Sequence, residues 1–197
     1  MECHARSGKL HYIVQERRKV RKIAPKLAES ELFEYSVRYL ARFACSSEEL
    51  KAKLRLRAAT PGDVDGVIAR LKDIGYLNDR KFAESFASNR AENDGFGRMR
   101  VLSDLRSRRV APSTAEKVVA DVFEGKEEAE LIDAFIDRRM PSLKVQGLIE
   151  DQRDLAKAYR RLRRAGFSSG GVLAALKRRA ARPEEIEEPV EEPIEEE

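Results

Sequence analysis

Lysine and arginine side chains concentrate in three separate segments of this 197-residue sequence. Residues 46–58, 97–109 and 151–165 together hold 15 basic and five acidic residues, a net charge of +10. Guanidinium and ammonium groups bind phosphate and carboxylate oxygens, so such clusters indicate a polyanionic partner. We expect the binding side chains to be Lys51, Lys53, Arg55, Arg57, Arg98, Arg100, Arg106, Arg108, Arg109, Arg160, Arg161, Arg163 and Arg164.

Residue types that perform nucleophilic or metal chemistry are few in this sequence. Cys3, His4 and His11 lie close together, but their spacing matches no established zinc pattern. Cys45 has no histidine near it, and we expect it to fill a corner of a helical core. The glycine turn at residues 95–97 lacks the Gly-Lys-Ser/Thr ending of a phosphate-binding loop. The sequence therefore predicts a binding protein rather than an enzyme, with no metal and no cofactor.

The net charge of +4 conceals a strongly acidic segment. Residues 183–197 hold nine glutamates and no basic residue, so residues 1–182 carry 39 basic and 26 acidic residues, a net charge of +13. Like charges and prolines keep such a segment extended, and we expect 183–197 to be a disordered acidic tail. Residues 1–30 are basic with weak periodicity, and we expect a flexible arm there. The basic body favours a nucleic-acid or nucleoprotein partner, although a basic surface without such a partner remains the alternative.

The sequence contains no run of 18 apolar residues and begins without the apolar region of a secretory signal. Its two cysteines, Cys3 and Cys45, do not make a disulfide framework. We therefore expect a cytoplasmic monomer that has no contact with a membrane.

From residue 31 onward, apolar residues recur at helical spacing. The first helix is expected over residues 31–43, with Phe43 on its buried face. The next begins at a capping box on Ser46, Thr60 caps the third, and Gly75 ends it. The pattern predicts an all-helical fold, whose other helices are expected near residues 78–93, 97–109, 112–124, 126–140, 151–165 and 168–182.

An internal repeat relates these helices in threes. The apolar pair Leu50 and Leu54 recurs 51 positions later and again after a further 57, at Val101, Leu105, Ala158 and Leu162. The repeat predicts three-helix units at residues 31–77, 78–125 and 126–182, stacked in an elongated array. A single globule of nine helices is the alternative, because its apolar stripes would look the same.

The three basic segments are the second helices of these units, whereas the first helices sum to −2 and the third helices to +1. If the units stack regularly, the second helices form one periodic basic face. Helix C-termini favour lysine and arginine in any protein, which accounts for Arg55 and Arg57. The same effect does not account for Arg98 and Arg100, which lie near the start of their helix.

Four stretches resemble the RecX family. Residues 47–54 (SEELKAKL) resemble the opening of its repeats, and residues 75–83 (GYLNDRKFA) are similar to its most characteristic stretch. GFGR at 95–98 lies where the family has a Gly-aromatic-Gly turn, and AGF at 165–167 matches the boundary of its last repeat. The resemblance extends over about residues 31–180. We interpret the 75–83 stretch as structural and expect Tyr76 and Leu77 to bury the junction between units. The other residues of this structural motif are Gly75, Asp79, Phe82 and Ala83.

The resemblance implies tandem three-helix units that bind along the groove of a RecA–DNA filament. It also implies modulation, usually inhibition, of RecA ATP hydrolysis and strand exchange, and hence a role in homologous recombination, DNA repair and the SOS response. The family usually has Lys-Gly after the second helix of its first two repeats, where this sequence has Ala58-Ala59 and Arg109-Val110. Two other hypotheses stay open: a helical module with weak, sequence-independent DNA affinity and no RecA partner, and a protein-only scaffold.

Overall fold

The computed structural model describes residues 26–141 and 152–180, which form an all-helical protein, as predicted. The predicted acidic tail and most of the predicted arm lie outside these residues. In the described residues, no helix combines the length and apolar character that a membrane span requires. The helices in these ranges are α1 (Glu29–Leu40), α2 (Ser47–Arg55), α3 (Pro61–Asp73), α4 (Asp79–Glu92), α5 (Arg98–Ser107), α6 (Pro112–Val122), α7 (Glu128–Arg139), α8 (Gln152–Arg164) and α9 (Ser169–Lys177).

The capping residues predicted from the sequence begin their helices. Ser46 and Glu49 exchange reciprocal side-chain-to-backbone hydrogen bonds, each 3.2 Å long, at the start of α2. Thr60 forms the same box with Asp63 at the start of α3, and the Asn78 side chain caps α4. Each cap satisfies a backbone N–H that the helix leaves unpaired, a contribution of about 1 kcal/mol.

Three hydrophobic clusters divide the described residues, one for each predicted unit. We refer to α1–α3 as unit 1, α4–α6 as unit 2 and α7–α9 as unit 3. The residues related by the repeat occupy equivalent core positions and are at most 2% exposed: Leu50, Leu54, Val101, Leu105, Ala158 and Leu162. Separate cores favour the array over a single nine-helix globule, while the boundaries between units stay a prediction.

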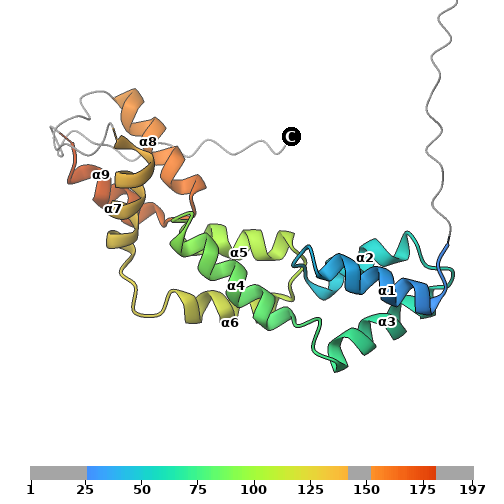
Figure 1. Cartoon of the computed structure of the whole chain (residues 1–197). Helices are drawn as coiled ribbons and strands as arrows, with labels where there is room; N and C mark the ends of the chain where they lie inside the picture. The colour runs from blue at the N-terminus through green and yellow to red at the C-terminus, as the bar shows by residue number, and fades with distance from the viewer. Residues whose placement is uncertain (1–25, 142–151, 181–197) are drawn as a thin grey trace, which may run out of the picture.

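Figure 1 shows the three units following one another along an elongated molecule, with unit 2 in the middle. At the outer edge of unit 1, the backbone of Leu27 pairs with Ala58 in an isolated bridge. There Leu27 N donates to the Arg57 carbonyl oxygen at 2.8 Å, and Ala59 N donates to the Leu27 oxygen at 2.9 Å. This short pairing covers the C-terminal end of α2.

Two aromatic residues do not lie where the sequence predicted. α1 ends at Leu40, so Phe43 follows the helix and is 56% exposed. Tyr76 was expected to bury the junction between units but is 60% exposed, whereas Leu77 is 4% exposed. In the link between α3 and α4, the Leu77 side chain therefore supplies the burial that was expected of both residues.

A residue with positive φ stands two positions after the last residue of α3, α5 and α8, at Gly75 (78°), Arg109 (55°) and Gly166 (94°). Glycine adopts this region without strain, but arginine has a Cβ that approaches the following carbonyl oxygen. The turn after α5 is therefore made by an arginine in the left-handed conformation.

Replacing Arg109 by glycine is expected to stabilise the protein by roughly 0.5–1 kcal/mol, because it relieves this strain. Urea denaturation followed by circular dichroism measures the change. Lys117→Gly, at an exposed site within α6, is the control and should cost about 0.8 kcal/mol. Equal destabilisation by both changes would show that the turn after α5 imposes no strain.

Candidate functional site

The junction between units 1 and 2 joins the start of α2 to the end of α5. Ser46 Oγ donates to the Arg108 carbonyl oxygen at 2.6 Å, and Asp79 Oδ1 accepts from Ser47 N at 2.6 Å. The Arg108 guanidinium reaches back and donates to the Ala44 carbonyl oxygen at 3.0 Å. Asp79, in the 75–83 stretch, thus holds the two units in a fixed orientation.

The junction between units 2 and 3 joins the start of α5 to the end of α8. Gly97 N donates to the Ala165 carbonyl oxygen at 2.8 Å, and Met99 N donates to the Gly166 oxygen at 3.1 Å. A Cβ on Gly97 would lie 2.5 Å from the Gly166 oxygen, and a Cβ on Gly166 would overlap the Arg100 backbone. The GFGR and AGF stretches therefore meet backbone to backbone, at a separation that only glycine permits.

The two junctions are equivalent under the internal repeat. The offset of 51 relates Ser46 to Gly97, and the offset of 57 relates Arg108 to Ala165. In both junctions the start of one second helix meets the end of the second helix in the following unit. The helices α8, α5 and α2 therefore follow one another end to end along the array (Figure 1).

Several of the predicted binding cations on α2 are engaged within unit 1. Lys51 Nζ lies 2.7 Å from Asp65 Oδ1, and this hydrogen bond, together with the lysine charge, lowers the pKa of the Asp65 carboxyl. Lys53 and Arg57 lie over the rings of Tyr39 and Tyr35, each at 4.6 Å from the centroid. These three cations stabilise unit 1 and have less capacity for an external anion.

Other predicted cations are engaged in units 2 and 3. Arg100 pairs with Asp104 at 3.0 Å, Arg106 with Glu116 at 3.1 Å, and Arg108 with Glu49 of unit 1 at 2.8 Å. In unit 3, two guanidinium groups donate to backbone oxygens at 2.7 Å and 2.8 Å, from Arg161 to Arg139 and from Arg163 to Phe167. Arg108 in particular is a junction residue, although the sequence predicted it as part of a binding face.

The remaining predicted cations are exposed, and their side chains form no hydrogen bond or ion pair within residues 26–141 and 152–180. Four of them lie on the three second helices and one lies in the turn after α5: Arg55, Arg98, Arg160 and Arg164 on the helices, and Arg109 in the turn. We call these five residues the free cations. Their guanidinium groups keep their full hydrogen-bonding capacity for a partner.

Lys157 shares these properties but was missing from the predicted set. Lys157, Arg160 and Arg164 recur at the i, i+3, i+7 spacing of one helix face, and all three are exposed. The buried side of α8 holds Leu155, Ala158, Tyr159 and Leu162. This spacing was visible in the sequence, and it defines a row of three cations that we call the α8 stripe.

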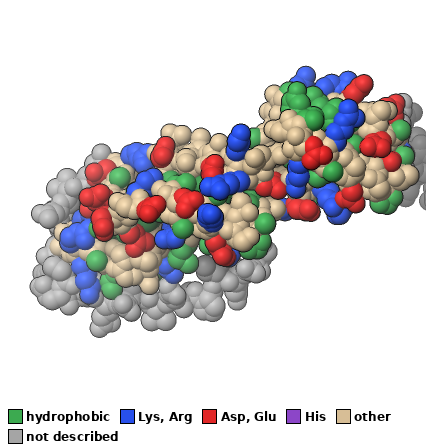
Figure 2. All heavy atoms as spheres, turned by 90° about the horizontal axis from the view of Figure 1, so that it is seen from below, with side chains coloured by type: hydrophobic (Ala, Val, Ile, Leu, Met, Phe, Trp, Pro, Cys, Tyr) green, Lys and Arg blue, Asp and Glu red, His purple; other side chains and the backbone are tan. Residues whose placement is uncertain are grey.

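Figure 2 shows one side of the molecule, on which lysine and arginine side chains are interspersed with aspartate and glutamate. That side does not present a uniform positive surface. Neighbouring acids there weaken the field of the cations that they pair with.

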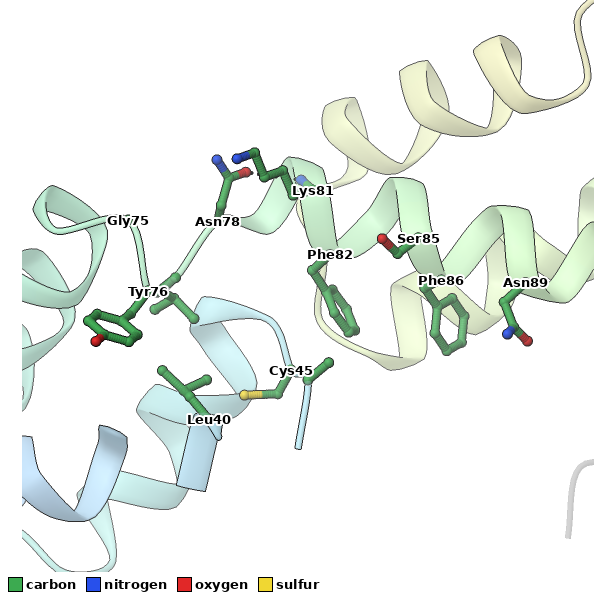
Figure 3. Close-up of a pocket in the computed structure, with 12 residues that line it drawn as sticks. Leu40, Cys45, Gly75, Tyr76, Asn78, Lys81, Phe82, Ser85, Phe86 and Asn89 are labelled. Atoms are coloured by element: carbon green, nitrogen blue, oxygen red, sulfur yellow. Dashed lines mark hydrogen bonds between the residues drawn. The ribbon is translucent and has the colours of Figure 1, made fainter. Parts of the chain in front are cut away.

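A groove of about 510 Å³ lies between units 1 and 2 (Figure 3). Phe82 and Phe86 point into it from α4, and Cys45 lies opposite them. Burial, with a smaller effect of the Glu49 charge, raises the pKa of the Cys45 thiol to about 11, which keeps the thiol neutral at pH 7. The position agrees with the predicted packing role of Cys45, and a neutral buried thiol is a poor nucleophile.

Comparison with known proteins adds to this geometry. A sequence model described as "RecX, second three-helix domain" matches residues 78–119. "Regulatory protein RecX" of Deinococcus radiodurans is 32% identical over 171 residues, which cover 83% of this chain and 78% of the relative. The protein of the same name from Halorhodospira halophila is 32% identical over 141 residues, covering 71% of this chain and 83% of the relative.

The fold is also similar to that of a solved structure. The crystal structure of RecX from Lactobacillus salivarius superposes with a TM-score of 0.63 at 18% identity, covering 76% of this chain and 94% of that chain. The relatives are named as regulatory proteins and not as enzymes. The Deinococcus and Halorhodospira proteins are 32% identical to this chain over more than two thirds of each protein, and the structure shows three-helix units. The protein therefore belongs to the RecX family.

Proposed function

We propose that this protein binds the RecA–DNA filament and inhibits RecA ATP hydrolysis and strand exchange, and thereby regulates recombination and DNA repair. The observation that supports this most directly is the end-to-end order of α8, α5 and α2, each of which bears free cations. A row of separated cations on an elongated body suits a long partner that repeats its phosphates and acidic groups.

A DNA-binding module without a RecA partner is the second candidate. Paired hydrogen bonds to adenine come from asparagine and glutamine, whereas arginine binds phosphates as well as guanine. Within α2, α5 and α8, Gln152 is the sole asparagine or glutamine. Contact with DNA should therefore be weak and independent of sequence. A protein with such contact gains specificity if it also binds RecA, which favours the filament regulator over the DNA-only module.

Adding the protein at a fraction of the RecA concentration is expected to slow RecA ATP hydrolysis on single-stranded DNA severalfold. A protein that spans several subunits of a filament needs less than one copy per RecA to act. A coupled ATPase assay on preassembled filaments measures the effect, with strand exchange and filament lifetime measured in parallel.

Excess single-stranded DNA distinguishes the two candidates. A DNA-only module competes for free DNA, so it leaves preassembled filaments intact and its effect disappears when DNA is in excess. A filament-binding regulator keeps its effect under both conditions. If ATP hydrolysis, strand exchange and filament lifetime are all unchanged at saturating protein, the proposed function is wrong.

A further inference from the structure

We propose that the α8 stripe is the binding site of the chain's own acidic segment, residues 183–197, which thereby suppresses binding of bare nucleic acid. This inference does not depend on RecA. α8 holds six basic residues and one acidic residue, Asp154, a net charge of +5 (six minus one). Lys157, Arg160 and Arg164 form no internal ion pair within the described residues, so they are open to an external polyanion.

The acidic segment complements the stripe in charge. Its nine glutamates occur without a single lysine or arginine, mostly as adjacent pairs that recur every three or four residues. At about 3.3 Å per residue, successive pairs lie roughly 10–13 Å apart in an extended chain. Lys157 and Arg164 are seven residues apart on α8, which corresponds to about 10 Å along the helix axis. Two consecutive glutamate pairs therefore match the length of the stripe.

The chain connection permits this contact. The described residues end at Ala180, which packs on the same hydrophobic cluster as Leu155 and Leu162 of α8. From Ala180 to Glu197 the chain can extend roughly 55 Å, whereas α8 is about 20 Å long. A tethered anion of this length has an effective concentration on the order of millimolar. It therefore competes with phosphate for the same three cations whenever free DNA is more dilute than that.

Binding of a fluorescent single-stranded oligothymidylate tests the inference at about 50 mM salt. Two changes of the acidic segment are compared: truncation after Arg182, and replacement of its nine glutamates by glutamine. Each is expected to tighten DNA binding about tenfold relative to the full chain, because each removes the competing anion. The gain should disappear as the salt concentration rises, since screening weakens both contacts.

The same truncation in two altered backgrounds separates a specific contact from general repulsion. In K157Q/R160Q/R164Q the truncation should give no gain, because the shared site has been removed. In R38Q/R42Q/K117Q, which loses the same charge at exposed positions away from α8, the full gain should remain. Circular dichroism establishes that all variants stay folded.

A zero-length carbodiimide crosslink provides a direct readout of the contact. The Lys157 amine should couple to a glutamate within 184–197 in a product of monomeric mass, as identified by mass spectrometry. The inference is overturned if truncation of the otherwise unchanged chain leaves DNA affinity as it was, or if the gain is equal in the K157Q/R160Q/R164Q background. Absence of any crosslink from Lys157 to the acidic segment would also overturn it.

Discussion

Gly166→Ala is expected to destabilise the array by roughly 3 kcal/mol, the sum of backbone strain and a steric clash. Gly166 has a φ of 94°, and an added Cβ would overlap the backbone at Arg100. The junction would have to open, which would break the hydrogen bonds from Gly97 N and Met99 N. Urea denaturation measures the total change, and hydrogen exchange of those two amides reports on the junction itself.

Two further glycine variants separate the two causes. Gly125 has a φ of 68° with nothing within 4 Å of an added Cβ, so Gly125→Ala introduces the strain alone and should cost about 1 kcal/mol. Gly97 has an ordinary φ of −74°, so Gly97→Ala introduces the clash alone. If Gly97→Ala and Gly166→Ala cost no more than Gly125→Ala, units 2 and 3 do not meet as closely as described.

Reversing three of the free cations, in R98E/R160E/R164E, is expected to weaken binding to the RecA–DNA filament by at least about tenfold at 0.1 M salt. Each reversal removes one cation that pairs with an anion and adds a repulsion. The slope of log affinity against log salt should also become shallower, by about 0.7 for each single-strand phosphate that the protein no longer neutralises. Fluorescence anisotropy at several salt concentrations measures both quantities, and folding should be unaffected because the three side chains have no internal partner within the described residues.

The matched control is R38E/R42E/K117E, which changes the net charge by the same amount at exposed positions outside the second helices. Equal weakening by both triple variants would mean that total charge, and not its position on the second helices, determines binding. Arg108→Glu provides a contrast, because Arg108 contacts Glu49 and the Ala44 carbonyl oxygen across a junction. It should lower the free energy of unfolding, an effect that the free cations do not have.

The helices and the division into units were predictable because both depend on local patterns. Caps such as Ser46 and Asn78 act on backbone groups three residues away, and an apolar stripe needs only the helical period. The repeat offsets of 51 and 57 also identified equivalent core positions, such as Leu50, Val101 and Ala158. Gly97 and Gly166 lie in stretches that the family resemblance singled out, but their contact across the junction was not predicted.

Contacts between distant segments could not be predicted in the same way. Arg108 lies 59 positions from its partner Glu49, and Lys51 is 14 positions from Asp65, so periodicity gives no indication of either pair. The sequence therefore located the basic helices but gave no indication of which of their cations have internal partners. Tyr76 and Phe43 were misplaced because their burial depends on where a helix ends and how a link crosses between units.

The pairing of Leu27 with the end of α2 has a consequence for the size of the array. Arg57 lies 51 positions before Arg108, so the two carbonyl oxygens are equivalent under the internal repeat. The Arg108 oxygen accepts a hydrogen bond from Ser46 of the preceding unit, and the Arg57 oxygen accepts one from Leu27 N. Leu27 N occupies the place where the start of another second helix would donate. The backbone at Leu27 thus caps this end of the array, as terminal caps do in solenoid proteins. A further three-helix unit could pack against this end only if the Leu27 segment were displaced.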